Sequence, residues 1–306
     1  MRLKGLLRRS RHISGIYPSW LNLDKFLGRV KKPAKHLKID DEEHQLPTVN
    51  GSTPPNGTTA TLKLALLFTV LLIFGINLAH IIYKPPYTLI KLLQWKYAEV
   101  TFHFPPPSFS HRKVISLTID DSPSSETTKI LDLLHTFDAK ATFFVIGKQI
   151  VEYPHVVQRI FDEGHEVGIH GWSDEASYSL PLPELVRQIR EMEQLLPKNS
   201  HRSKWFRPGS GWFSKPMISM LRTLGYQIVL GSIYPHDPQI PFPRINAAHV
   251  LSLIRPGAII IMHDRRPYSS RQLELILNGL ADDDWTVQTL SATQQIMKAA
   301  TIVSNR

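Results

Sequence analysis

The feature that most limits the fold of this chain is an alternation of short apolar runs and longer amphipathic stretches after residue 113. Near-continuous apolar runs are typical of parallel strands buried on both faces, and amphipathic stretches between them are typical of covering helices. Seven such units predict a parallel α/β domain, either an irregular (β/α) barrel of seven to eight units or an open doubly wound sheet. The predicted strands are 114–119, 141–146, 166–169, 205–207, 227–233, 258–262 and 286–290, and the predicted helices are 126–137, 151–163, 183–196, 215–224, 247–254, 271–280 and 293–300.

A second constraint is the stretch 64–82, which contains no Asp, Glu, Lys or Arg. It is long enough to cross the hydrocarbon core of a bilayer. We therefore predict one transmembrane helix over residues 62–83. The alternative is a buried helix of a globular core.

Charge is distributed unevenly in this chain of net charge +10, because residues 1–61 hold 11 Lys and Arg against 5 Asp and Glu. Positive charge favours the cytoplasmic side of a membrane. We predict a basic, largely disordered cytoplasmic segment over 1–61 and a domain outside the cytoplasm. An organelle transit peptide at the N-terminus is the alternative. No aromatic-interleaved basic stripe follows, which argues against a nucleic-acid partner.

Between the predicted span and the α/β domain, residues 84–111 contain three consecutive prolines at 105–107. Such a run favours an extended polyproline conformation. We predict a stalk over 84–111 and one globular domain over 112–306. The chain contains no cysteine, which excludes disulfides, Cys-ligated zinc and a thiol nucleophile.

Polar side chains follow most of the predicted strands at their carboxyl ends. In chain order they are Asp120 and Asp121, His170, Arg207, Tyr234 to Asp237, and His263 with Asp264. In parallel α/β folds the active site lies at this edge of the sheet. Each feature alone has a plainer explanation. Adjacent acids also start turns, and Asp174, four residues after His170, could cap a helix. Together they predict one site.

Six motifs occur in a fixed order: TIDDSP, ILDLL, AKATFFVIG, GHEVGIHGWSD, FRPGSG and IIIMHD. In these motifs and their order, residues 112–300 resemble the polysaccharide deacetylases, carbohydrate esterase family 4, also called the NodB-homology domain. The fold of that family is a distorted (β/α) barrel. The resemblance therefore favours the barrel over the open sheet.

The resemblance also implies roles for individual residues. Asp120 would be the general base, Arg207 would orient it, His263 would be the general acid and Asp237 its carboxylate partner, while Asp121, His170 and Asp174 would bind a divalent metal. The metal would be zinc or a harder ion such as manganese or cobalt. The implied reaction removes N-acetyl groups from a chitin- or peptidoglycan-like polysaccharide. A cation beside Asp121 would relieve its repulsion from Asp120.

Two positions depart from the family pattern. Asp174 stands where the family usually has a second histidine, and Pro238 follows Asp237 where the family usually has tryptophan. A carboxylate in place of imidazole shifts metal preference toward harder ions. Two alternatives stay open: a catalytically impaired glycan-binding protein of the same fold, and a hydrolase of a non-sugar amide.

Overall fold

The structure is a computed structural model that describes residues 57–106, 112–198 and 202–304. Contacts divide the chain into two units, Met1–Thr61 and Leu62–Arg306, and nearly all described residues belong to the second. Most of the predicted cytoplasmic segment, residues 1–61, lies outside the described residues.

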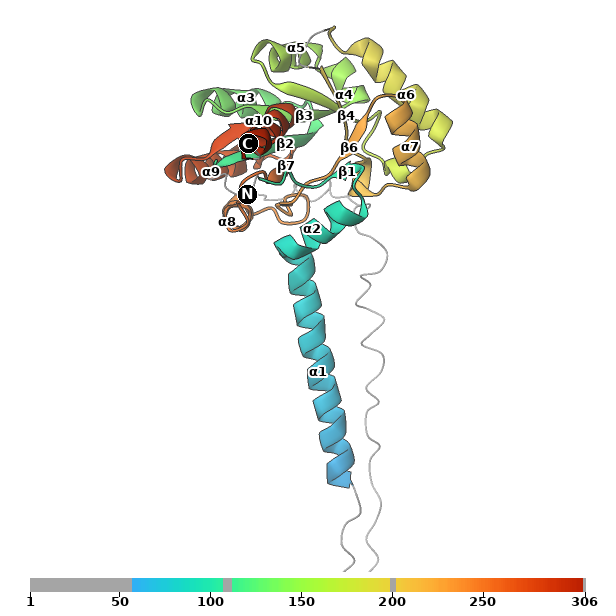
Figure 1. Ribbon diagram of the computed structural model, residues 1–306, viewed down its shortest axis with the longest axis vertical. Coiled ribbons are helices and arrows are strands. Elements are labelled where there is room, and N and C mark those ends of the chain that lie inside the picture. The colour runs from blue at the N-terminus through green and yellow to red at the C-terminus, as the bar shows by residue number, and fades with distance from the viewer. Residues whose placement is uncertain (1–56, 107–111, 199–201, 305–306) are drawn as a thin grey trace, which may run out of the picture. The chain divides into compact units, whose positions relative to one another are not determined.

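One curled sheet of eight parallel strands forms the centre of the second unit (Figure 1). Its order is β1-β6-β5-β4-β3-β2-β7, and β8 pairs with the first part of β2. The strands are β1 (Val100–Thr101), β2 (Val114–Ser122), β3 (Ala141–Ile146), β4 (Glu166–Gly171), β5 (Arg202–Phe206), β6 (Gln227–Val229), β7 (Ile259–His263) and β8 (Thr286–Gln288). Every residue of β2, β3 and β4 is buried, as expected for strands covered on both faces.

The sheet curls far enough for its two ends to meet beyond β6. The Ile233 carbonyl accepts a hydrogen bond from the Ile261 amide at 2.9 Å, and Ile233 forms a parallel bridge to Ile260 of β7. The predicted irregular (β/α) barrel is therefore confirmed, and the open doubly wound sheet is wrong.

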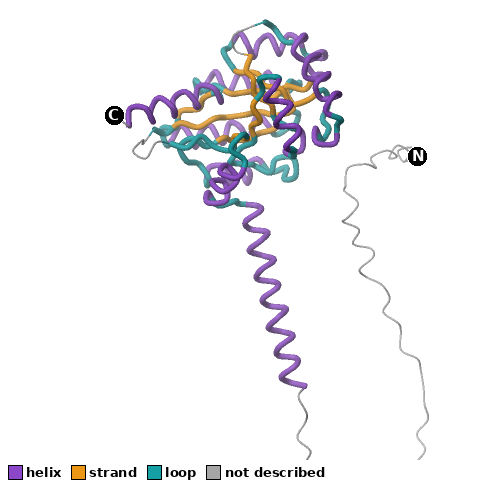
Figure 2. The backbone as a smooth tube through the Cα atoms, turned by 45° about the vertical axis from the view of Figure 1, so that its right-hand side comes forward, coloured by secondary structure: helices purple, strands orange, loops and turns teal. Residues whose placement is uncertain are grey.

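Helices surround the strands, which lie inside (Figure 2). They are α3 (Thr127–Thr136), α4 (Gly147–Glu152), α5 (Pro154–Asp162), α6 (Leu182–Leu195), α7 (Lys215–Thr223), α8 (Pro243–Leu251), α9 (Ser269–Asp282) and α10 (Leu290–Ser304). The helix predicted over 151–163 is instead two helices that meet at Tyr153, because Pro154 has no amide hydrogen to continue α4 and occupies the first turn of α5.

Of the segment 84–111, predicted as a stalk, the described residues 84–106 contribute to the domain. They contain α2 (Tyr87–Lys96) and β1, and β1 pairs with β6. Ile90, Val100 and Phe102 are buried in the main apolar core. The Gln94 side chain ties α2 to the strand, since its amide donates to the Val100 carbonyl and its oxygen accepts from the Phe102 amide. The run of three prolines at 105–107 did not predict these contacts.

Before this segment lies α1 (Gly57–Tyr83). Within the described residues it is the one helix long and apolar enough to cross a membrane, over Thr59–Tyr83, and none of its most apolar 18-residue window is buried. Its Phe68 and Phe74 side chains are exposed, so the alternative of a buried core helix is wrong.

Candidate active site

Strand register brings the proposed base and the proposed acid together. Asp120 near the end of β2 is the direct partner of His263 at the end of β7. The Asp264 amide donates to the Asp120 carbonyl at 2.9 Å, which continues this pairing one residue further. Asp120 is 3% exposed and Asp121 is 4% exposed, so both carboxylates lie inside the protein.

Two irregularities turn side chains toward this edge of the sheet. The pairing of β2 with β3 shifts between Ile119 and Ser122, and Asp121 has a φ of 61°. The pairing of β3 with β4 shifts at His170, because Ile169 and Gly171 pair with consecutive residues of β3. Bulges of this kind redirect side chains next to active sites. They bring Asp121 and His170 face to face, with Asp121 Oδ1 at 3.6 Å from His170 Nε2.

Asp120 forms a buried ion pair with Arg207. Arg207 Nη1 donates to Asp120 Oδ1 at 2.7 Å, and the same guanidinium donates to the Thr118 hydroxyl and to the Val229 and Leu230 carbonyls. Burial alone would raise the pKa of Asp120, but the charge of Arg207 holds that pKa below its usual value. The carboxylate is therefore ionised at neutral pH.

His263 forms a second pair with Asp237. Asp237 Oδ1 lies 2.8 Å from His263 Nδ1, and Asp237 Oδ2 accepts from the His263 amide at 2.8 Å. Burial alone would lower the pKa of His263, but the hydrogen bond and charge of Asp237, helped by Asp120 and Asp121, raise it above 6.5. The raised pKa favours the protonated imidazole, which carries a proton on Nε2.

His170 is oriented by its other ring nitrogen. Nδ1 lies 2.7 Å from the Arg207 carbonyl oxygen, to which it donates, and Nε2 faces Asp121. A backbone carbonyl behind a histidine is a common support for metal ligands. Burial raises the pKa of Asp121 above its ordinary value. A cation there would offset the cost of burying this carboxylate.

Asp174, the third predicted ligand, is not brought to this pair. Its side chain is 61% exposed, and Oδ2 lies 3.4 Å from Arg265 Nη1. Accordingly, no group of three His, Asp or Glu side chains arranged for a metal occurs within the part of the chain that the structure describes. The arrangement offers two ligands in place, Asp121 and His170, and a third that faces solvent.

Several site residues were not assigned from the sequence. Asp264 is fully buried and accepts hydrogen bonds from the Ser124 and Thr127 hydroxyls, which fixes the loop after Asp121. Arg266 reaches within 4.0 Å of Asp121 Oδ2. Asp264 belongs to the IIIMHD run, and its acid type at a strand end was the only available signal. Aromatic side chains that could stack on a sugar ring differ in exposure: Trp212 is 71% exposed, while Trp172 and Phe213 pack against the core.

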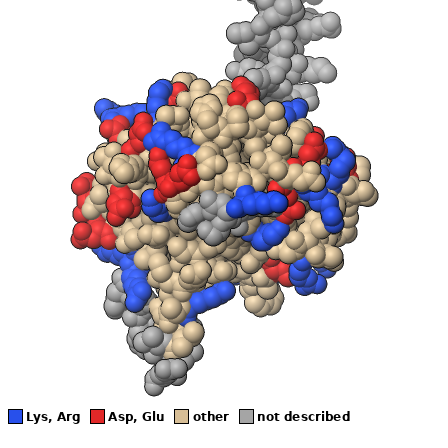
Figure 3. Space-filling model, turned by 90° about the horizontal axis from the view of Figure 1, so that it is seen from above, with Lys and Arg blue, Asp and Glu red and all other residues tan. Residues whose placement is uncertain are grey.

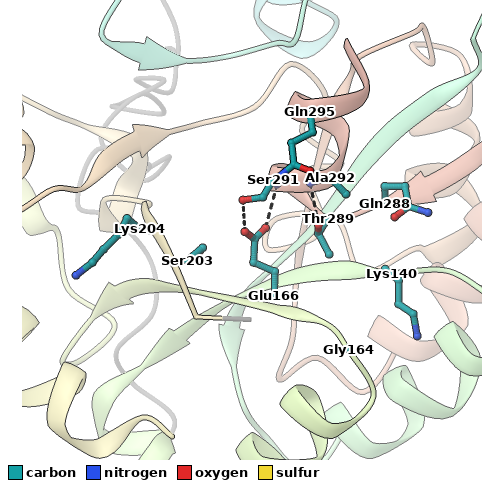
Figure 4. Close-up of a pocket in the computed structure, with 10 residues that line it drawn as sticks. All are labelled: Lys140, Gly164, Glu166, Ser203, Lys204, Gln288, Thr289, Ser291, Ala292 and Gln295. Atoms are coloured by element: carbon teal, nitrogen blue, oxygen red, sulfur yellow. Dashed lines mark hydrogen bonds between the residues drawn. The ribbon is translucent and has the colours of Figure 1, made fainter. Parts of the chain in front are cut away.

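A separate cavity of about 470 Å³ lies at the opposite end of the strands (Figure 4). Glu166, the first residue of β4, points into it but accepts hydrogen bonds from the Thr142 and Ser291 hydroxyls and from the Ser291 amide. This carboxylate holds the start of α10 in place. Its bonds explain its burial without a ligand.

Comparison with known proteins agrees with these motifs. A sequence model of the polysaccharide deacetylase family matches residues 109–229. The peptidoglycan-N-acetylmuramic acid deacetylase PdaC of Bacillus subtilis is 30% identical over 190 residues, which are 61% of this chain and 40% of that protein. Its solved structure superposes with a TM-score of 0.60 at 29% identity and covers 64% of this chain and 96% of that one. The chain thus spans well under half the length of this relative.

Two further similar proteins are an active enzyme by name and a pseudoenzyme. A peptidoglycan-N-acetylglucosamine deacetylase of Bacillus cereus is 30% identical, over 51% of this chain and 74% of its own length. A pseudoenzyme of the same family from Bacillus anthracis shares the fold with a TM-score of 0.58 at 23% identity, over 64% of this chain and 68% of that one. The fold alone therefore does not decide activity. The chain carries the ordered motifs and the barrel, and it covers 74% of the Bacillus cereus deacetylase at 30% identity. It therefore belongs to the polysaccharide deacetylase family.

Proposed function

We propose that this protein is a metal-dependent hydrolase that removes N-acetyl groups from a chitin- or peptidoglycan-like polysaccharide. The observation that carries the proposal is the pair of buried dyads at one edge of the sheet, Asp120 with Arg207 and His263 with Asp237. One dyad holds a carboxylate whose pKa is lowered, and the other holds a histidine whose pKa is raised. A base and an acid side by side are what amide hydrolysis requires.

The residues present fit a divalent metal in part. Asp121 and His170 would hold it, because a carboxylate oxygen and an imidazole nitrogen face each other at 3.6 Å. Asp174 would join them after leaving Arg265. Its Oδ2 lies 3.4 Å from Arg265 Nη1, which is a long contact for an ion pair. When bound, such an ion lowers the pKa of water to about 7 and polarises a carbonyl. Two carboxylates and one histidine favour manganese or cobalt relative to a site with two histidines.

The side chains of the dyads then divide the proton transfers between them. Asp120, kept ionised by Arg207, accepts a proton from the water that attacks the acetamide carbonyl. His263, oriented by Asp237, donates its Nε2 proton to the acetamide nitrogen as the C–N bond breaks. The products are acetate and a free amine on the sugar. Tyr234, whose ring meets His263 edge-on at 5.8 Å, covers one side of the acid.

The proposed location is based on α1. We propose that it crosses a membrane once, with residues 1–61 in the cytoplasm and the catalytic domain outside, where polysaccharide substrates occur. The basic charge of residues 1–61 supports this orientation. On the face drawn in Figure 3, basic and acidic side chains are interspersed, which gives no support to a nucleic-acid partner.

The outward position of Asp174 favours a second candidate, a glycan-binding protein with little catalysis. Acetate release from N-acetylated chitin and peptidoglycan fragments by the full chain in detergent, with and without chelator, separates the two. We expect release that chelator abolishes and manganese or zinc restores. Glycan binding without any release would leave the second candidate, and release from small amides alone would favour the non-sugar hydrolase.

A further inference from the structure

Large apolar side chains are exposed on two short helical surfaces of the domain. On α2, Leu92 is 53% exposed and Trp95 is 79% exposed, and lysines flank them at positions 91 and 96. At the start of α8, Phe242 is 58% exposed and Ile245 is 51% exposed. Apolar residues scattered singly need no explanation, but groups of them mark interaction surfaces.

Direct contacts place the α8 group beside the end of α1. The ring of Tyr83, the last residue of α1, stacks on His236 at 4.6 Å and lies 4.4 Å from the ring of His249. His236 Nε2 also lies 2.8 Å from the Tyr83 carbonyl oxygen. Ile245 precedes His249 by one helical turn of α8, so the two side chains share a face. Ile245 therefore lies on the side of α8 that meets α1.

The α2 group is also confined to this region. Only residues 84–86 separate α1 from α2, and three residues span at most about 11 Å. One face of α2 is fixed to the domain, since Ile90 is buried and the Tyr87 ring lies beneath the Arg255 guanidinium. The opposite face, with Leu92 and Trp95, is left exposed.

We propose that the exposed face of α2 and the first turn of α8 form a membrane-contacting surface, which docks on the headgroup region of the bilayer that α1 crosses. The proposal rests on the proposed membrane anchoring by α1. Tryptophan is enriched at the level of lipid headgroups, and lysines beside it extend their charges toward water and phosphate while their stems cover apolar surface. A lipid surface therefore matches this mixture of Trp, Leu and Lys.

Docking of this surface would hold the acid close to the membrane. The Tyr234 ring contacts His236 at 5.0 Å and His263 at 5.8 Å. Three consecutive ring contacts thus connect the last residue of α1 to His263. The enzyme would act on glycan next to the bilayer surface, with no flexible tether that lets it reach far from the membrane.

The absence of cysteine allows a direct test, since a single introduced cysteine can be labelled with a nitroxide. The full chain is reconstituted in vesicles of phosphatidylglycerol and phosphatidylcholine as Leu92→Cys, Trp95→Cys and Ile245→Cys. Leu71→Cys within α1 is the lipid control. Val151→Cys on α4, as exposed as Leu71 at 59%, is the water control. Collision rates with oxygen, which concentrates in lipid, and with a water-soluble nickel complex locate each label.

We expect labels at 92, 95 and 245 to collide with oxygen several-fold more than the label at 151, and with nickel several-fold less. Water-like values at these three positions, with a lipid-like value at 71, would overturn the proposal. A water-like value at 71 as well would remove the span and the proposal together. Protection from both reagents would indicate a protein contact, such as a second copy, and would also overturn it. Acetate release, measured on the same samples, tests the proposed reaction independently.

Discussion

The two halves of the candidate site differ in how completely they are assembled. In the acid–base half, Asp120 with Arg207 and Asp237 with His263 form short, buried pairs at 2.7 and 2.8 Å. In the metal half, Asp121 and His170 lie 3.6 Å apart, and Asp174 faces solvent near Arg265. The first half is held by the core and the sheet, whereas the second ends on a surface loop. In the proposed reaction, the groups that transfer protons are placed by folding alone, whereas a complete set of three metal ligands would require Asp174 to move.

The largest expected effect comes from removing either proton-transfer group. Asp120→Asn or His263→Ala should lower turnover by roughly 10²–10⁴-fold, the usual contribution of general acid–base catalysis. The measurement is acetate release under saturating metal. Asp162→Asn and His155→Ala, both on the exposed side of α5, are matched controls. Near wild-type turnover in a folded Asp120 or His263 variant would show that its assigned role is wrong.

The next effect is on stability and concerns the support of the base. Arg207→Ala leaves Asp120 buried without a partner, and breaking a buried pair in this way costs about 3–5 kcal/mol. Thermal or urea unfolding of the full chain measures it. Arg187→Ala, which removes an exposed arginine that pairs with two acids on α6, should leave the unfolding midpoint nearly unchanged. An Arg207→Ala protein as stable as the parent would mean that the acid–base half is not fixed by its ion pair.

Metal affinity sharpens the contrast between the two halves. His170→Ala should weaken zinc and manganese binding by at least about 10–100-fold, the scale seen even for groups behind the ligands. Asp174→Ala should weaken it less, because its side chain must first leave Arg265. Asp174→His should shift preference toward zinc. Calorimetric titration of the three variants decides. If Asp174→Ala and His170→Ala lose the same affinity, the metal half is as fully assembled as the other.

The smallest expected effect is a displaced pH profile. Because the pKa of His263 is raised above 6.5, activity should fall on the alkaline side only as pH rises through that higher value. Asp237→Asn removes the charge that raises it, so the alkaline limb should move to lower pH. The raised pKa of His263 also affects the stability of the fold. The stabilisation that His263 contributes is complete below its unfolded pKa near 6.5 and is lost as pH rises through its folded pKa. If the alkaline limb of the pH–activity profile stays in place in Asp237→Asn, a group other than His263 controls that limb.

The sequence by itself determined seven of the eight strands and the edge where the candidate site lies, and its family motifs favoured the barrel. Burial on both faces leaves near-continuous apolar runs in a parallel strand, and such runs can be recognised without a structure. Parallel strands also send their carboxyl ends to one edge, so the convergence of Asp120, His170 and His263 followed from their positions after three strands. The motifs that they share with the polysaccharide deacetylases supplied the roles that periodicity could not.

Tertiary structure decided what depends on contacts between distant segments. The pairing of Arg207 with Asp120 requires the register of the four strands from β5 to β2, and Asp174 lies near Arg265 from another loop. The segment 84–111 looked like a stalk because its prolines are local signals. The burial of Val100 instead depends on its pairing with Ile228 in β6. Local periodicity indicates which residues are buried. Their contact partners depend on how the barrel closes, and this can be seen only in the folded chain.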